Sequence, residues 1–147
     1  MLRHILHCAE AWGIGIAGAA EIDEVNILNA TRRAMQRAVE ALPVRPDHLL
    51  LDAVRLPAVP LPQTAVIHGD RRSVSIAAAS VLAKVARDRL MEHYDRIFPG
   101  FGFAAHKGYG TSMHLAALDS RGACTLHRLT FRGVGGQRAF SFAADRA

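Results

Sequence analysis

The sequence predicts one α/β domain, on the evidence of how apolar residues are spaced along it. Two long segments, 21–42 and 74–95, carry apolar side chains at the three- and four-residue spacing of amphipathic helices. Short apolar runs at 12–19, 47–54 and 64–70 have the length and composition of strands. Helices that alternate with short strands are typical of α/β folds. Three strands are fewer than such a sheet usually has, which indicates an incomplete fold.

The first third of the chain is predicted to run helix, strand, helix. Residues 4–12, HILHCAEAW, have the character of the last turns of a helix. In 12–19, apolar side chains alternate with small residues, which predicts a strand whose glycines let another backbone approach closely. The helix over 21–42 follows, and Pro43 stops it.

The middle of the chain is predicted to hold two neighbouring strands. Residues 47–54, DHLLLDAV, form a buried strand with apolar residues on both sides of Asp52. Three prolines make 55–63 a loop. Residues 64–70 form a second short strand that ends at a glycine and is followed by the long helix.

The last part of the chain is predicted to be a loop and a short helix. The Phe-Pro-Gly at 98–100 closes the long helix, and a glycine-rich loop with aromatic residues follows at 101–112. Thr111 is expected to cap a short helix that Gly122 ends.

The composition limits the class of protein. Half of the 147 residues are hydrophobic and 21% are charged, which fits a globular domain, predicted over 1–135 with a frayed tail at 136–147. The 18 Lys and Arg outnumber the 13 Asp and Glu, and a net charge of +5 favours an anionic partner such as nucleic acid. Cys8 and Cys124 match neither a metal-binding spacing nor a disulfide framework, and no apolar run is long enough to cross a membrane. We therefore expect a cytoplasmic monomer with no membrane partner.

Two carboxylates, Asp52 and Asp70, are the main candidates for chemistry. Asp52 lies within an apolar run, where an unpaired carboxylate is costly to bury, and Asp70 follows the next strand. Adjacent strands would bring both to one edge of the sheet, where oxygen ligands favour Mg²⁺ or Mn²⁺. Such ions support phosphodiester hydrolysis. Alternatively, Asp70 caps a helix or turn, and Asp52 is an ordinary residue at a strand end.

Basic and aromatic residues form a second set of candidates, for substrate binding. Lys107 and Tyr109 of HKGYG can meet a phosphate and a sugar or base, although a glycine-rich loop with a packed tyrosine explains them equally. Arg71, Arg72 and Ser73 can line a phosphate path, or can simply begin a solvated helix. The histidines of the last third show no spacing typical of zinc ligands, so no zinc site is predicted from His106, His114 and His127.

Several ordered blocks together resemble the ribonuclease HII family, the type 2 ribonucleases H. They span about residue 10 to residue 135 and read EIDEVNILNAT, LLLDA, HGDRRSVSIAAASVLAKVARD, FGFAAHKGYGT and HRLTF. The resemblance implies an RNase H-like fold and an endonuclease that cleaves RNA in RNA–DNA hybrids, or at ribonucleotides embedded in duplex DNA. It implies a four-carboxylate site for Mg²⁺ or Mn²⁺, with Asp52 and Asp70 as two catalytic metal ligands. It also implies that Tyr109 contacts the sugar at the DNA side of a ribonucleotide junction.

The sequence departs from that family at its beginning. The family opens with a strand bearing adjacent Asp and Glu, followed by a Gly-Arg-Gly turn that reads the 2′-hydroxyl, and these 147 residues hold no such segment. The only Asp-Glu pair, Asp23-Glu24, does not match by position. With the central strand and two carboxylates absent, we expect the chain alone to be poorly stable and inactive or nearly so. The alternatives are a non-catalytic nucleic-acid-binding fragment and a degenerate remnant without a stable fold.

Overall fold

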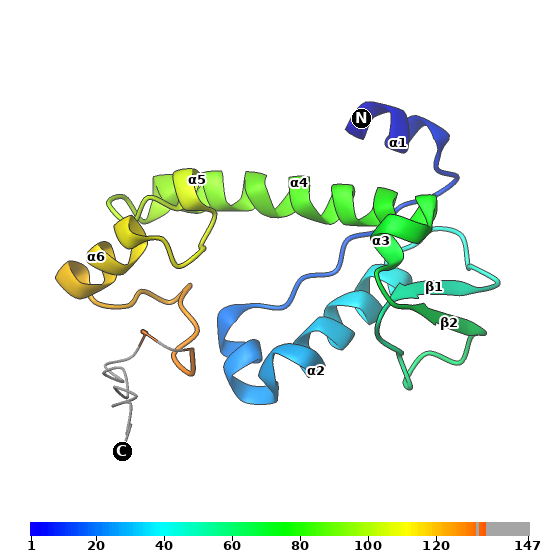
Figure 1. Cartoon of the computed structure of the whole chain (residues 1–147), viewed down its shortest axis with the longest axis horizontal. Helices are drawn as coiled ribbons and strands as arrows, with labels where there is room; N and C mark the ends of the chain where they lie inside the picture. The colour runs from blue at the N-terminus through cyan, green and yellow to red at the C-terminus, as the bar shows by residue number, and fades with distance from the viewer. Residues whose placement is uncertain (132, 135–147) are drawn as a thin grey trace, which may run out of the picture.

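Helices and a small parallel sheet make up the computed structural model, which describes residues 1–131 and 133–134 (Figure 1). This mixed architecture confirms the predicted α/β class, whereas the predicted tail at 136–147 lies outside the described residues. No helix of the described part is long and apolar enough to cross a membrane. The elements follow in the order α1 (Leu2–Cys8), α2 (Ala19–Glu40), β1 (Leu49–Asp52), β2 (Gln63–Val66), α3 (Gly69–Arg72), α4 (Val74–Ile97), α5 (Phe103–His106) and α6 (Ser112–Arg121).

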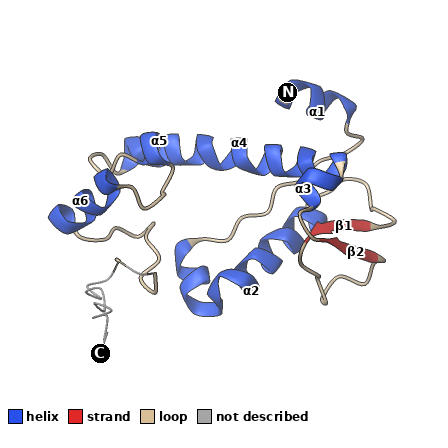
Figure 2. Ribbon diagram, in the orientation of Figure 1, coloured by secondary structure: helices blue, strands red, loops and turns tan. Residues whose placement is uncertain are grey.

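Helix α4 connects the two ends of the molecule. Figure 2 shows the strands together at one end of α4, beside α3, and helices α5 and α6 at the other end. The helix begins where the Ser73 hydroxyl accepts a hydrogen bond from the Ile76 N–H (3.4 Å), and it ends at Ile97, before the predicted Phe-Pro-Gly stop. Its predicted limits, 74–95, therefore fall within two residues of the observed ones.

Helix α2 is interrupted at Asn26. The backbone of Asn26 has a φ of 67° and a ψ of 165°, so two helices meet there at a kink. The Asn26 side chain accepts the N–H of Asn29 (3.1 Å), as a helix-capping residue does, and this restarts the helix. The helix ends at Glu40, three residues before the predicted stop at Pro43.

The sheet has two parallel strands, which pair from Leu49 with Gln63 to Asp52 with Val66. Leu49 and Leu51 are buried, but Leu50 between them is 46% exposed. The apolar run of β1 therefore covers a core on one face only, so the predicted buried strand is buried on one face and exposed on the other. The predicted limits, 47–54 and 64–70, were also too long, because each observed strand has four residues.

No strand forms over 12–19, so that prediction is wrong, although the close backbone approach predicted there is confirmed. This segment packs its glycines on α2: a Cβ on Gly15 would lie 2.6 Å from the Ala38 nitrogen and 2.9 Å from the Ala34 carbonyl carbon. The apolar side chains between the glycines point outward, with 58% of Ile16 exposed. An alternating pattern favours extended backbone, but a strand also needs a neighbouring strand, and the described residues provide none here.

Two separate hydrophobic clusters stabilise the molecule. The first lies where α2 meets the sheet and is built around Leu49, Leu51 and Leu56. The second lies where α4 meets α5 and α6 and is built around Phe101, Phe103 and Leu118. The two ends of the molecule therefore each have their own small core.

A carboxylate clamp joins the start of α2 to the segment after α6. Asp23 accepts hydrogen bonds from the Leu129 N–H (2.7 Å), the Thr130 N–H (3.1 Å) and the Thr130 hydroxyl (2.5 Å). These hydrogen bonds hold the pKa of the Asp23 carboxyl below its usual value, the Thr130 hydroxyl being the main cause. The clamp connects residues more than 100 positions apart in the sequence.

Candidate active site

The end of the sheet brings Asp52 next to the residue that precedes Asp70. Asp52 is the last residue of β1, and one of its carboxylate oxygens (Oδ1) accepts the N–H of Gly69 (2.9 Å). Asp70 follows Gly69 in the first turn of α3 rather than ending a strand, because β2 already ends at Val66. Both carboxylates are exposed. The backbone next to Asp70 therefore lies close to Asp52, on a short helix rather than at a strand end, and the convergence of the two carboxylates stays a prediction.

Gly69 allows this close arrangement. A Cβ at this position would lie 2.6 Å from the Cδ1 of Ile76 and 3.4 Å from the Asp52 carboxylate. The preceding residue, His68, has a φ of 53° and turns the chain sharply out of the sheet into α3. The small residue and the turn together set Asp70 beside the end of β1.

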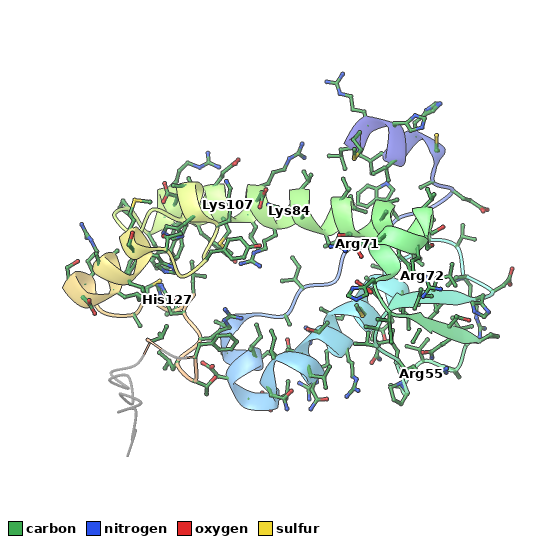
Figure 3. All side chains as sticks on the ribbon, viewed as in Figure 1. Arg55, Arg71, Arg72, Lys84, Lys107 and His127 are labelled. Carbon is green, nitrogen blue, oxygen red and sulfur yellow. The ribbon has the colours of Figure 1, made fainter. Side chains whose placement is uncertain are left out.

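The basic residues that follow Asp70 differ in their surroundings. Arg71 and Arg72 are exposed at the sheet end of α4, where Figure 3 also shows Arg55. The Ser73 hydroxyl caps α4, so its oxygen already has a backbone partner. Arg71 and Arg72 thus present exposed side chains directly after Asp70 in the sequence, whereas the Ser73 hydroxyl caps α4.

The loop with Lys107 and Tyr109 lies further along α4. The Lys107 ammonium bonds to Glu92 (2.7 Å), and only 17% of its side chain is exposed. Tyr109 is 56% exposed, and the guanidinium of Arg87 lies 5.0 Å from its ring centroid. At 1.5 Å per residue, the start of α4 and Arg87 are separated by about 20 Å along the helix axis. The structure therefore does not bring Lys107 and Tyr109 into contact with the Asp52 and Asp70 corner.

The sequence profile of the ribonuclease HII family matches residues 6–134. The chain belongs to this family. The ribonuclease HII of Geobacter metallireducens is 55% identical over 127 residues, which are 86% of this chain and 60% of that protein. The ribonuclease HII of Syntrophotalea carbinolica is 56% identical over 123 residues, 84% of this chain and 59% of that protein. That of Moorella thermoacetica is 55% identical over 122 residues, 83% of this chain and 59% of that protein. The chain thus spans about 60% of the length of these ribonuclease HII relatives.

Two oxygen ligands suit the metals expected of a ribonuclease HII. Mg²⁺ is commonly held by one or two carboxylates together with water and substrate phosphates, so Asp52 and Asp70 fit such an ion by their chemistry and exposure. Within residues 1–131 and 133–134, no group of three or more His, Cys, Asp and Glu side chains is placed to hold a metal. A metal site at Asp52 and Asp70 therefore stays a prediction.

Three buried histidines form a cluster that no sequence pattern predicted. His106, His114 and His127 are 5%, 5% and 7% exposed and pack against one another next to the Tyr109 loop. Their spacing of 8 and 13 residues follows no helical or strand period, because they come from α5, α6 and the segment after α6. The only available signal was the presence of three histidines close to a single glycine-rich loop.

Proposed function

We propose that this chain takes part in metal-dependent hydrolysis of RNA within RNA–DNA hybrids, or at ribonucleotides embedded in duplex DNA. Membership of the ribonuclease HII family supports the reaction class. The observation that carries the proposal for this chain is the hydrogen bond from the Gly69 N–H to Asp52, which supports a pairing of Asp52 with the adjacent residue Asp70 at an exposed corner.

Asp52 and Asp70 would hold Mg²⁺ or Mn²⁺. When bound, the ion would activate water and neutralise charge on the leaving oxygen. The Gly69 N–H occupies one oxygen of Asp52 and fixes its direction, so the other oxygen remains available as a ligand. Arg71 and Arg72 would offset the phosphate charge of the substrate.

Tyr109 would contact the substrate through its exposed ring, which can cover a sugar or base. Lys107 keeps further N–H donors beside the bond to Glu92, and the Ser73 O–H can donate to a phosphate while its oxygen accepts the Ile76 N–H. We place the main substrate contacts on Tyr109, Arg71 and Arg72, whose side chains are exposed, with Lys107 and Ser73 as additional donors. The setting we propose is the cytoplasm, during DNA replication and repair, with the protein working as a monomer.

Metal binding is the direct test of the carboxylate pair. The electron paramagnetic resonance signal of free Mn²⁺ should decrease when the full chain is added, and less so with Asp52→Asn or Asp70→Asn. The matched control is Asp119→Asn, at an exposed aspartate of α6. Equal Mn²⁺ binding by the wild type and the Asp52→Asn, Asp70→Asn double variant would refute this site.

Cleavage is tested with Mn²⁺ on a DNA duplex that carries one ribonucleotide and on an RNA–DNA hybrid. We expect little cleavage by the chain alone. Cleavage should appear on addition of the part of the Geobacter metallireducens relative that this chain does not match, and Asp70→Asn should abolish it. Salt-sensitive binding without cleavage in that mixture would favour the non-catalytic alternative.

A further inference from the structure

The histidine cluster formed by His106, His114 and His127 lies at the α5 and α6 end of the molecule. The rings of His106 and His114 stack with centroids 4.2 Å apart, and those of His114 and His127 are 5.2 Å apart. Phe103 contacts all three rings, with centroid distances between 5.5 and 6.0 Å. Figure 3 shows His127 on this side of the molecule, far from Arg71 and Arg72.

Two members of the cluster form hydrogen bonds with the backbone of the Tyr109 loop, one with the Gly108 N–H and one with the Tyr109 carbonyl. The Nδ1 of His106 accepts the N–H of Gly108 (3.1 Å), and its Nε2–H donates to the carbonyl of Phe101 (2.7 Å). The Nδ1–H of His114 donates to the carbonyl of Tyr109 (2.9 Å). The partners settle which nitrogen carries the proton, because an N–H can only donate and a carbonyl can only accept.

The third member continues the same pattern. Because the proton of His114 is on Nδ1, its Nε2 accepts from the Nε2–H of His127 (3.0 Å). With its proton on Nε2, the Nδ1 of His127 accepts the N–H of Cys124 (3.0 Å); the Sγ and the carbonyl oxygen of Cys124 also lie near this nitrogen, at 3.1 and 3.3 Å. Each imidazole therefore donates once and accepts once, which is the hydrogen-bonding capacity of the neutral form.

We propose that His106 and His114, supported by His127, are positioning residues that hold Tyr109 ready for nucleic acid, and that they do so only while neutral. The substrate part of this inference rests on the proposed function. The cluster fixes the Gly108 N–H and the Tyr109 carbonyl, and so leaves the exposed Tyr109 ring on a rigid backbone. A ring held in its binding conformation loses less conformational entropy when a ligand arrives.

Protonation would break this arrangement. A second proton on His114 would put two N–H donors face to face across the 3.0 Å between its Nε2 and that of His127. A second proton on His127 would likewise displace the Cys124 N–H and replace it with a bond from Nδ1–H to the Cys124 carbonyl, 3.3 Å away. Burial lowers the pKa of both His114 and His127, the carbonyls of Tyr109 and Cys124, which accept from the protonated rings, partly counter this, and the charges of the neighbouring imidazoles lower the pKa further.

No carboxylate offsets those effects on His114 and His127 among the described residues. Glu92, on the neighbouring α4, is already paired with Lys107. Other titratable or charged groups of the segments around the cluster are Arg87, Tyr94 and Asp95 of α4, Tyr109 of the loop, Asp119 and Arg121 of α6, and Cys124 and Arg128 after it. We therefore expect acidification below the usual histidine pKa to release the Tyr109 loop.

Amide hydrogen exchange of the full chain tests the holding step without any substrate. His114→Leu removes both hydrogen bonds and should speed exchange in 107–111 about tenfold at pH 7.5. His114→Asn retains a donor near the Nδ1 position and should restore most of the protection. The control is His7→Leu, at an exposed histidine of α1, which should change nothing in the loop.

The wild-type chain gives a second measurement that needs no variant to fold. After correction for intrinsic exchange, protection of 107–111 should fall between pH 7.5 and pH 5.5, while protection of β1 should not. Equal loop protection at both pH values, or in His114→Leu and the wild type, would overturn the inference.

Duplex binding then tests whether the held loop matters for nucleic acid. Affinity is measured by fluorescence anisotropy with a duplex that carries one ribonucleotide. Tyr109→Ala should weaken binding about tenfold at pH 7.5 and hardly at all at pH 5.5. A Tyr109 contribution independent of pH would refute the positioning role. Absence of any duplex binding would instead refute the proposed substrate, and the exchange experiment alone would then decide whether the histidines hold the loop.

Discussion

The substitution Gly15→Ala tests how the segment 12–19 is held on α2. A Cβ at this position would lie 2.6 Å from the nitrogen of Ala38 and 2.9 Å from the carbonyl carbon of Ala34, and both atoms belong to the backbone of α2. A side chain could rotate away from such a contact, but helix backbone cannot, so the whole segment must move outward. That movement also stretches the hydrogen bond from Arg37 to the carbonyl of Ile16 (2.7 Å).

Overpacking of this kind costs about 1–3 kcal/mol, and a clash with backbone belongs at the upper end of that range. For a chain of this size, about 3 kcal/mol corresponds to a fall in Tm of roughly 6–12 °C. The assay is thermal unfolding followed by far-UV circular dichroism. The control is Gly110→Ala, where a Cβ meets no atom within 4 Å, and it should leave Tm unchanged or slightly higher. A Gly15→Ala variant as stable as the wild type would show that 12–19 does not pack on α2 as described.

Three further predictions concern the hydrogen bonds of individual side chains. Asp52→Ala removes the acceptor of the Gly69 N–H and should lower the free energy of unfolding, measured in urea titrations, by about 1 kcal/mol. Asp52→Asn keeps an acceptor oxygen and should cost less, so equal losses in the two variants would contradict this prediction. Thr111→Ala removes the α6 cap and should also cost about 1 kcal/mol, whereas Thr111→Ser, which keeps the hydroxyl, should cost much less. The pKa of Asp23 is lowered in the folded state, chiefly by the Thr130 hydroxyl. The Asp23 carboxylate therefore stabilises the fold above its usual pKa of 3.8, and this contribution is lost as the pH falls from 3.8 toward the lower folded pKa. Asp23→Asn should flatten the pH dependence of the urea midpoint in that acidic range, and an unchanged dependence would count against the clamp.

Local signals in the sequence predicted the helix boundaries well. Thr111 accepts the N–H of His114 (3.3 Å) at the start of α6, and Gly122 ends that helix with a φ of 75°, as expected. These features depend on residues three or four positions apart, so the sequence contains all that determines them. The kink at Asn26 was missed because the helical pattern continues on both sides of it.

Structural features that depend on partners distant in the sequence were predicted less well. The alternation in 12–19 correctly indicated extended backbone and close glycine packing, but pairing needs a neighbouring strand, which no pattern within the segment can supply. For the same reason, the apolar run of β1 indicated a buried strand, whereas Leu50 is 46% exposed and only the face with Leu49 and Leu51 is buried.

The candidate site likewise has features that the sequence predicted and features that no local pattern indicated. Adjacent strands predicted that Asp52 and Asp70 lie at one edge of the sheet; Asp52 does end a strand and binds the N–H of Gly69, whereas Asp70 itself lies in the short helix α3. The bond between Lys107 and Glu92 joins residues 15 positions apart across a loop, and no local pattern indicated it. The pairing of His114 with His127 bridges α6 and the segment after it, so it too follows no period.

The separation of the two hydrophobic clusters has a consequence for the proposed pH response. One cluster, around Leu49 and Leu51, supports β1 and so the Asp52 corner, and the other supports the loop with Tyr109. Local unfolding proceeds in units that share a core, so opening of one end need not open the other. Because α4 keeps the two ends apart, protonation of the histidine cluster should release Tyr109 while the bond between Gly69 and Asp52 persists. Acid should therefore weaken duplex binding at a pH where Mn²⁺ binding by the carboxylate pair is still measurable.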